Sequence, residues 1–185
     1  MTTFWYVLFV ETGKENESVR EIAKGGIEGV QAFVPMYNTK FRNSGKIVSE
    51  KKRLFPGYIF VEAEIPGLEF YASVRRLVVR SEHILKVLKY GNGYLEYLFE
   101  MKEEEVAVFQ KLWNCDCCVE MSQGVIVGDR IVISDGPLFG FESYIKRINR
   151  HKMEATLELE LMGDKREVIV GLEVVKKVSD AGALV

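Results

Sequence analysis

The sequence predicts a two-domain protein of the α+β class. Residues 4–113 alternate strand-like and helix-like segments, whereas residues 124–178 hold only short strand-like segments separated by glycine turns. A chain of 185 residues can bury one full hydrophobic core and a small second one. We therefore expect an α/β sandwich, in which helices flank a sheet, followed by a small five-stranded barrel.

The composition is that of a folded globular protein, with 48% hydrophobic and 28% charged residues. The net charge of -2 provides no basic field over the whole molecule, so any nucleic-acid site must be local. The apolar run Phe4–Val10 is too short for a membrane helix and no basic region precedes it. We expect a cytoplasmic protein with no membrane partner.

The first half is expected to begin with a strand at residues 5–12, which are aromatic and β-branched. Apolar residues at helical spacing follow from Glu15 until the Gly25-Gly26 stop signal. Residues 30–37 and 54–63 again have the composition of strands, and a polar, basic stretch separates them. Pro35 has no N–H, which places it at a sheet edge or at the end of its strand.

The rest of this half is expected to form a helix at residues 68–77, a strand at 84–88, a glycine turn at 91–93 and a helix at 101–113. Three glutamates lie in the first turn of the last helix, where they suit the helix dipole. The order β-α-β-β-α-β-α predicts a mixed or antiparallel sheet covered by helices.

Residues 114–123 lose this periodicity and are expected to be a linker. In the second domain Leu157, Leu159 and Leu161 alternate with Glu158 and Glu160, which is typical of a strand with one buried face. The five predicted segments lie at residues 130–134, 142–148, 155–162, 167–170 and 172–178.

The sequence holds no motif that indicates catalysis. It lacks GxxxxGK[ST], a third glycine after Gly91-x-Gly93, HExxH and GxSxG. Cys115, Cys117 and Cys118 are too few for a zinc site by themselves and do not resemble a secreted disulfide framework. They are interpreted as reduced linker thiols, with a redox sensor as the alternative. We expect a binding protein, not an enzyme, with no cofactor and no metal.

Three segments together resemble the NusG family of transcription elongation factors. They are WYVLFVETGKE from Trp5, RLFPGYIFVE from Arg53 and GDRIVISDGPLFGFES from Gly128, and they occur in the order and spacing of that family. The resemblance implies an NGN domain over residues 1–113, a linker over 114–123 and a KOW domain, an SH3-like five-stranded β-barrel, over 124–178. Residues 179–185 form a tail.

The resemblance also implies that the NGN domain binds RNA polymerase, at the clamp helices of the β' subunit, through a concave apolar surface. The matching positions are Trp5, Tyr6, Phe55, Pro56 and Tyr58. Preformed aromatic surface loses little entropy on binding, which suits it to hold a helical partner. The alternative is that about half of the five are core residues, since strand aromatics are ordinarily buried.

The stretch from Lys40 to Arg53 resembles the basic hairpin loop of the NGN domain. Such a loop can contact upstream or non-template DNA through phosphates, without reading sequence. The alternative is a solvated loop. The cations are Lys40, Arg42, Lys46, Lys51, Lys52 and Arg53, against Glu50 alone.

The KOW segment departs from the general factor in two places. A cluster of cations with no acidic residue among them replaces acidic or mixed residues, and MGDKREV from Met162 replaces the family's FGRxTPVEL-like sequence. The second departure puts contacts with ribosomal protein S ten and Rho in doubt. The cluster suits structured RNA, because guanidinium groups stack on unpaired bases or bind phosphates. It comprises Lys146, Arg147, Arg150, His151 and Lys152.

These departures resemble the specialised LoaP group of antiterminators. The sequence therefore predicts a monomeric antitermination factor whose KOW domain captures a leader RNA hairpin. The alternatives are a general NusG factor that couples polymerase to the ribosome or Rho, and a ribosome-associated KOW protein that binds ribosomal RNA. A KOW domain stored as a helical hairpin, as in the RfaH group, is not expected because the alternation at residues 157–161 favours a strand.

Overall fold

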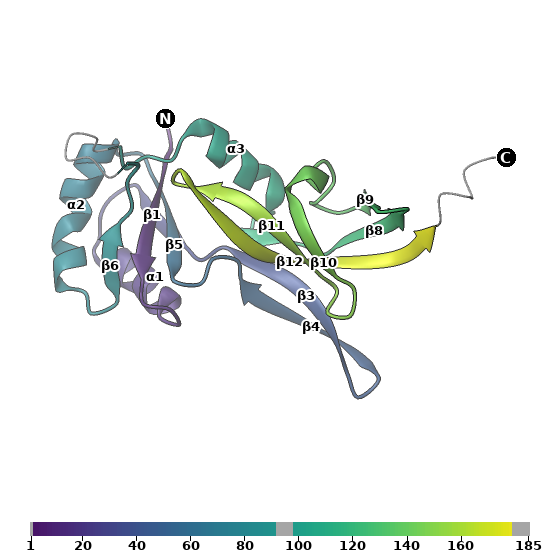
Figure 1. Ribbon diagram of the computed structural model, residues 1–185. Helices are drawn as coiled ribbons and strands as arrows, with labels where there is room; N and C mark the ends of the chain where they lie inside the picture. The colour runs from purple at the N-terminus through teal and green to yellow at the C-terminus, as the bar shows by residue number, and fades with distance from the viewer. Residues whose placement is uncertain (1, 92–97, 179–185) are drawn as a thin grey trace. The chain divides into compact units, whose positions relative to one another are not determined.

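The computed structural model describes residues 2–91 and 98–178, without the side chains of Arg42, Asn43, Lys177 and Val178. Its helices and sheets confirm the α+β class (Figure 1). Part of the predicted turn at 91–93 and the whole predicted tail at 179–185 lie outside the described residues. No described helix is long and apolar enough to cross a membrane.

The chain forms two compact units, each assembled from several segments. The first comprises Met1–Pro35, Phe55–Val108 and Glu160–Asp164, and the second comprises Met36–Leu54, Phe109–Leu159 and Lys165–Val185. The division into domains at residues 114–123 stays a prediction.

A four-stranded antiparallel sheet in the order β2-β5-β1-β6 forms the centre of the first unit. The strands and helices follow the predicted order, and each predicted helix is present within a few residues of its expected ends. Their bounds are β1 (Phe4–Val10), α1 (Glu15–Lys24), β2 (Val30–Phe33), β5 (Tyr58–Ala63), α2 (Gly67–Arg80), β6 (Ile84–Val87) and α3 (Glu103–Leu112), whose last residues belong to the second unit.

The core of the first unit lies between one face of this sheet and the helices α1 and α2. Tyr6, Leu8 and Val10 alternate along β1 and are fully buried in this core. Phe70 and Val74 of α2 pack in the same cluster because their spacing places them on one helix face. The alternation that predicts the first strand therefore also selects the core face.

The strand predicted at residues 54–63 begins only at Tyr58. Phe55, Pro56 and Gly57 form a tight turn, in which the Phe55 carbonyl accepts a hydrogen bond of 3.1 Å from the Tyr58 N–H. Pro56 supplies a fixed φ at the second position, and Gly57 has φ of 84° at the third, the combination that a type II turn requires. We call these three residues the FPG turn.

The second unit holds two sheets. A three-stranded sheet in the order β4-β3-β7 comprises β3 (Met36–Asn43), β4 (Lys46–Arg53) and β7 (Cys118–Val119). A five-stranded sheet in the order β10-β11-β12-β8-β9 comprises β8 (Ser122–Val127), β9 (Arg130–Asp135), β10 (Ile145–Asn149), β11 (Glu154–Leu161) and β12 (Asp164–Val178), of which residues 160–164 belong to the first unit. The short 3-10 helix η1 (Glu142–Tyr144) precedes β10.

Five strands were predicted for the second domain, but two of their positions were wrong. Residues 167–170 and 172–178 are one strand, β12, because Gly171 continues the extended backbone and does not break it. A side chain at Gly171 would overlap the Asn38 carbonyl oxygen and the Met121 sulfur, so glycine is required there by a close approach. The fifth strand is β8, which begins inside the predicted linker.

Candidate nucleic-acid interface

The candidate polymerase-binding residues lie on two different faces of the first unit's sheet. Tyr6 points into the helix-covered core, where its ring stacks on Phe70 with centroids 3.8 Å apart and its hydroxyl donates a 2.6 Å hydrogen bond to the Ile65 carbonyl. Burial, and secondarily the charge of Glu100, raises the pKa of Tyr6. Tyr6 is therefore a core residue in this structure.

Trp5 points to the opposite face and belongs to an aromatic cluster with Phe33, Phe55 and Phe60. Trp5 meets Phe33 and Phe60 edge to face, at centroid distances of 5.7 Å and 6.5 Å, and Phe55 lies 5.6 Å from Phe60. Trp5 and Phe55 are buried. Phe33 and Phe60 were missed from the sequence, because spacing along one strand does not show which residues of different strands lie together.

Pro56 is exposed and Tyr58 is half-buried, so these two remain open to a partner. The Tyr58 ring lies 5.3 Å from that of Phe9. Glu15, which is fully buried, holds the FPG turn in place. Its carboxylate accepts a 2.8 Å hydrogen bond from the Gly57 N–H, a contact that the sequence pattern does not reveal.

The basic stretch at residues 40–53 is a regular β-hairpin, although no strand was predicted for these residues. Ser44 and Gly45 both have positive φ, of 47° and 80°, which is the geometry of a two-residue type I′ turn. The pairing of β3 with β4 has eight residues on each strand. Most residues of these strands are polar or charged, so hydrophobic periodicity could not predict them.

The register of this hairpin sorts its cations between two faces. Lys40, Lys51 and Arg53 share one face, since Lys40 pairs with Ser49, Asn38 with Lys51 and Met36 with Arg53. Lys46 and Lys52 lie on the other face with Glu50, which forms a 3.3 Å ion pair with Lys52. The side chain of Arg42 lies outside the described residues.

The cations of the second domain also divide into two groups. Lys146 forms a 3.2 Å ion pair with Glu158 of the neighbouring strand β11, and Arg147 forms a 2.5 Å ion pair with Glu167 of β12. Hydrogen bonds, first from Lys165 and then from Lys146, lower the pKa of Glu158. Two of the five predicted RNA-binding residues are therefore paired with carboxylates of other strands, which weakens their positive field.

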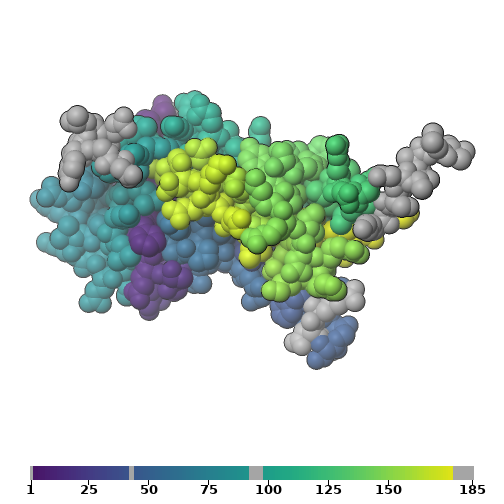
Figure 2. Space-filling model, in the orientation of Figure 1, coloured from purple at the N-terminus to yellow at the C-terminus, as the bar shows by residue number. Residues whose placement is uncertain are grey.

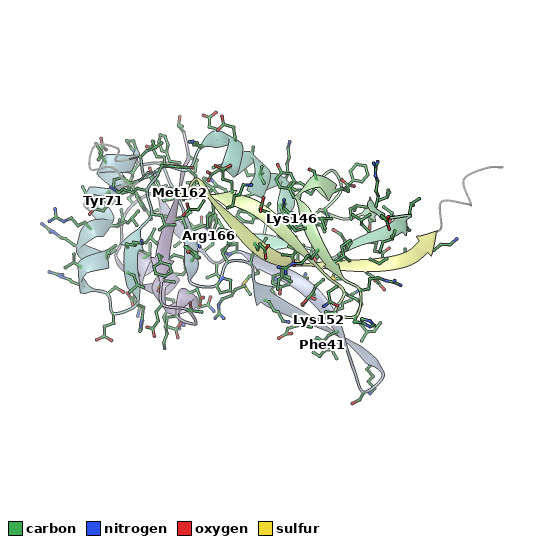
Figure 3. All side chains as sticks on the ribbon, in the orientation of Figure 1. Phe41, Tyr71, Lys146, Lys152, Met162 and Arg166 are labelled. Atoms are coloured by element: carbon green, nitrogen blue, oxygen red, sulfur yellow. The ribbon has the colours of Figure 1, made fainter. Side chains whose placement is uncertain are left out.

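The other three, Arg150, His151 and Lys152, occupy the turn between β10 and β11 and are exposed. None of them forms an ion pair within the described part of the chain. We call them the cationic turn. Residues near position 150, in light green, lie at the visible surface in Figure 2, and Figure 3 labels Lys146 on β10 and Lys152 in the turn.

A groove of about 880 Å³ lies beside the cationic turn. Strands β10, β11 and β12 and the turn itself line it, and Arg147 and all three residues of the cationic turn contribute to its walls. Its acidic members, Glu154 and Glu173, were not predicted, because they come from two strands that only the folded sheet brings together.

The three cysteines differ in burial: Cys115 is exposed, Cys117 is half-buried and Cys118 is buried. Cys118 is buried in β7, and burial is the main cause that raises its pKa. A raised pKa keeps a thiol protonated and poorly nucleophilic. Among the residues that the structure describes, no group of His, Cys, Asp and Glu side chains is arranged to hold a metal ion.

The fold is of the α+β class, and the structure places two groups of basic side chains on it, on the hairpin of β3 and β4 and at the cationic turn. The family model described as "Transcription termination factor nusG" matches residues 3–110, more than half of the chain. The chain therefore belongs to the NusG family.

Curated relatives match most of the length of this chain. The "Transcription termination/antitermination protein NusG" of Rickettsia felis is 22% identical over 183 residues, which cover 94% of this chain and 89% of the relative. The NusG of Borreliella burgdorferi is 20% identical and covers 96% of this chain and 100% of the relative. The NusG of Lactococcus lactis is 25% identical, with coverages of 84% and 83%.

Among solved structures, one titled "Domain interaction in Thermotoga maritima NusG" is similar, with 22% identity and a TM-score of 0.49. It covers 94% of this chain and 95% of the other.

Proposed function

We propose that this protein is a monomeric, non-catalytic transcription elongation and antitermination factor. It binds RNA polymerase through the NGN domain and captures a structured leader RNA through the KOW domain. The observation that carries the RNA proposal is the cationic turn: three exposed cationic or titratable side chains without ion pairs stand at the edge of a groove.

Membership of the NusG family and the geometry of the FPG turn support the polymerase contact. Pro56 and Tyr58 offer accessible apolar surface beside a rigid, buried aromatic cluster. Rigid aromatic surface of this kind is favoured at the centre of protein interfaces. We assign the clamp helices of the polymerase β' subunit as the partner, with Tyr58 as the main contact and Trp5 and Phe55 as its support.

The hairpin of β3 and β4 is proposed to lie near upstream or non-template DNA. On its face with Lys40, Lys51 and Arg53 the two strands contribute no acidic residue, and the nearby carboxylate of Glu120 accepts hydrogen bonds from Asn38 and Asn114. Such a face attracts phosphates without reading bases.

One observation favours a different role for the second domain. Lys146 and Arg147 are compensated by Glu158 and Glu167, so the basic cluster is weaker than its sequence suggests. This weaker basic cluster is compatible with a general NusG factor that couples polymerase to the ribosome or Rho. We favour the specialised, LoaP-type role because the cationic turn stays uncompensated and borders a groove.

The salt dependence of RNA binding tests this role. In the full chain, replacing Arg150, His151 and Lys152 together with alanine should lower the affinity for leader hairpins and flatten the slope of log affinity against log salt concentration. Lys146→Ala is the matched control, since its charge is already engaged by Glu158. If the triple variant keeps the parent's affinity and slope, the general-factor role takes precedence.

A further inference from the structure

We propose that the groove beside the cationic turn holds one unpaired RNA base that carries an exocyclic amino group. The sugar-phosphate backbone of that nucleotide lies along the cationic turn. This inference rests on the RNA binding proposed above and adds the class of base that the site accepts.

The size and lining of the groove suit a planar aromatic ring. Its volume of about 880 Å³ lies within the ~300–1,000 Å³ that is typical of small-molecule sites. Apolar atoms of Ile148, Met153, Ile169 and Val174 contribute to its walls. Ile169 is 43% exposed, and a stacked base would cover it.

The positive and negative side chains of the groove lie at different places, so a phosphate and a base would occupy different parts of the site. Arg150, His151 and Lys152 stand on the turn, where they attract phosphate. Glu154 lies at the first position of β11 and Glu173 lies on β12, and both line the same groove. Two carboxylates in the lining of the groove repel a phosphate there and favour a group that donates hydrogen bonds, such as a base.

Carboxylates select among the bases because ionised carboxylates only accept hydrogen bonds. Cytosine, adenine and guanine each carry an exocyclic amino group with two N–H donors. Uracil has no amino group: it has one ring N–H donor, and it presents a carbonyl oxygen, which repels a carboxylate, at the position where cytosine has its amino group. Glu154 and Glu173 therefore favour the amino-bearing bases, cytosine and adenine among them, over uracil.

Short fluorescent homopolymers test the preference with the full chain. Oligocytidylate, oligoadenylate and oligouridylate carry the same phosphates and differ only in their bases. Fluorescence anisotropy at one fixed salt concentration should show that oligocytidylate or oligoadenylate binds about tenfold more tightly than oligouridylate.

Glu154→Gln and Glu173→Gln keep the size of each side chain but add a donor, so they should abolish most of this preference. The slope with salt should not fall, because no cation is lost. Asp135→Asn is the matched control: it removes one carboxylate from an exposed position on β9, outside the groove, and should leave the preference unchanged.

The outcomes separate the two proposals. Equal affinity of the parent for all three homopolymers, with normal binding of leader hairpins, overturns the base preference and leaves the proposed RNA binding intact. Loss of the preference in Asp135→Asn as well overturns the role of the groove. Absence of binding to every RNA overturns both proposals.

Discussion

The carboxylate of Glu15 accepts a hydrogen bond of 2.8 Å from the backbone N–H of Gly57, which lies 42 positions away in the sequence. Its second oxygen accepts one of 3.0 Å from the Gly13 N–H. The side chain is fully buried, and these two bonds satisfy its oxygens. The first residue of α1 thereby fixes the FPG turn, which carries the candidate polymerase surface.

Replacing Glu15 with glutamine should destabilise the first unit. The new amide group would place a donor against an N–H that needs an acceptor, and leaving a buried polar group unsatisfied costs about 1 to 3 kcal/mol. Urea denaturation measures this cost. Glu17→Gln is the control, because the Glu17 side chain on the same helix is 41% exposed and its ion pair with Lys14 is a loose one of 3.7 Å. Equal stability of both variants would show that the Glu15 contact contributes nothing.

Tyr58 and Phe55 should respond differently to truncation, although they are close in the sequence. Phe55 is 4% exposed, so Phe55→Ala should cost about 3 to 5 kcal/mol of folding free energy. Tyr58 is half-buried, so Tyr58→Ala should chiefly weaken binding to clamp helices, by about 2 kcal/mol.

Thermal denaturation monitored by circular dichroism, beside affinity for a clamp-helix fragment, separates the two effects. A Tyr58→Ala variant that loses as much stability as Phe55→Ala would make Tyr58 a core residue and would remove it from the proposed interface.

Tyr37 should make the second unit sensitive to alkaline pH. Burial, with smaller effects of Glu154 and Glu50, raises the pKa of Tyr37 from its ordinary 10.0 to about 12. The folded pKa lies above the unfolded one, so the neutral phenol's contribution is fully present below pH of about 10 and is lost as pH rises through about 12. Tyr37→Phe cannot ionise and should reduce this loss.

Urea denaturation of the parent and of Tyr37→Phe, at about pH 9 and about pH 11.5, measures the difference. Absorbance of the ionised phenol over the same range reports the titration directly. The same fall in stability with pH in both proteins would exclude Tyr37 as its source.

Local patterns in the sequence determine much of the first unit. The aromatic and β-branched residues from Trp5 predict β1, and helical spacing predicts α1, α2 and α3 close to their observed bounds. These patterns succeed because each element buries one continuous apolar face, which imposes its own period on the sequence. The three motif segments likewise sufficed to indicate the NusG family, which the match over residues 3–110 confirms.

Such patterns do not predict elements whose pairing depends on partners that are distant in the sequence. The hairpin of β3 and β4 is mostly polar, so no hydrophobic period marks it, although Ser44-Gly45 permits its tight turn. Strand β8 forms in the predicted linker because β9 and β12 pair with it on either side. Gly171 suggests a break, yet a close approach of the backbone at Asn38 keeps it within one strand.

The candidate RNA surface shows the same division. The order of residues is enough to show that cations gather between Lys146 and Lys152 with no acidic residue among them. Which of these cations have a partner depends on strand pairing, because β11 and β12 bring Glu158 to Lys146 and Glu167 to Arg147 but bring no carboxylate into an ion pair with the described residues of the cationic turn. The net charge of a segment can be counted from its sequence. The attraction between two charges depends on the distance between them, and strand pairing sets that distance at a few ångströms.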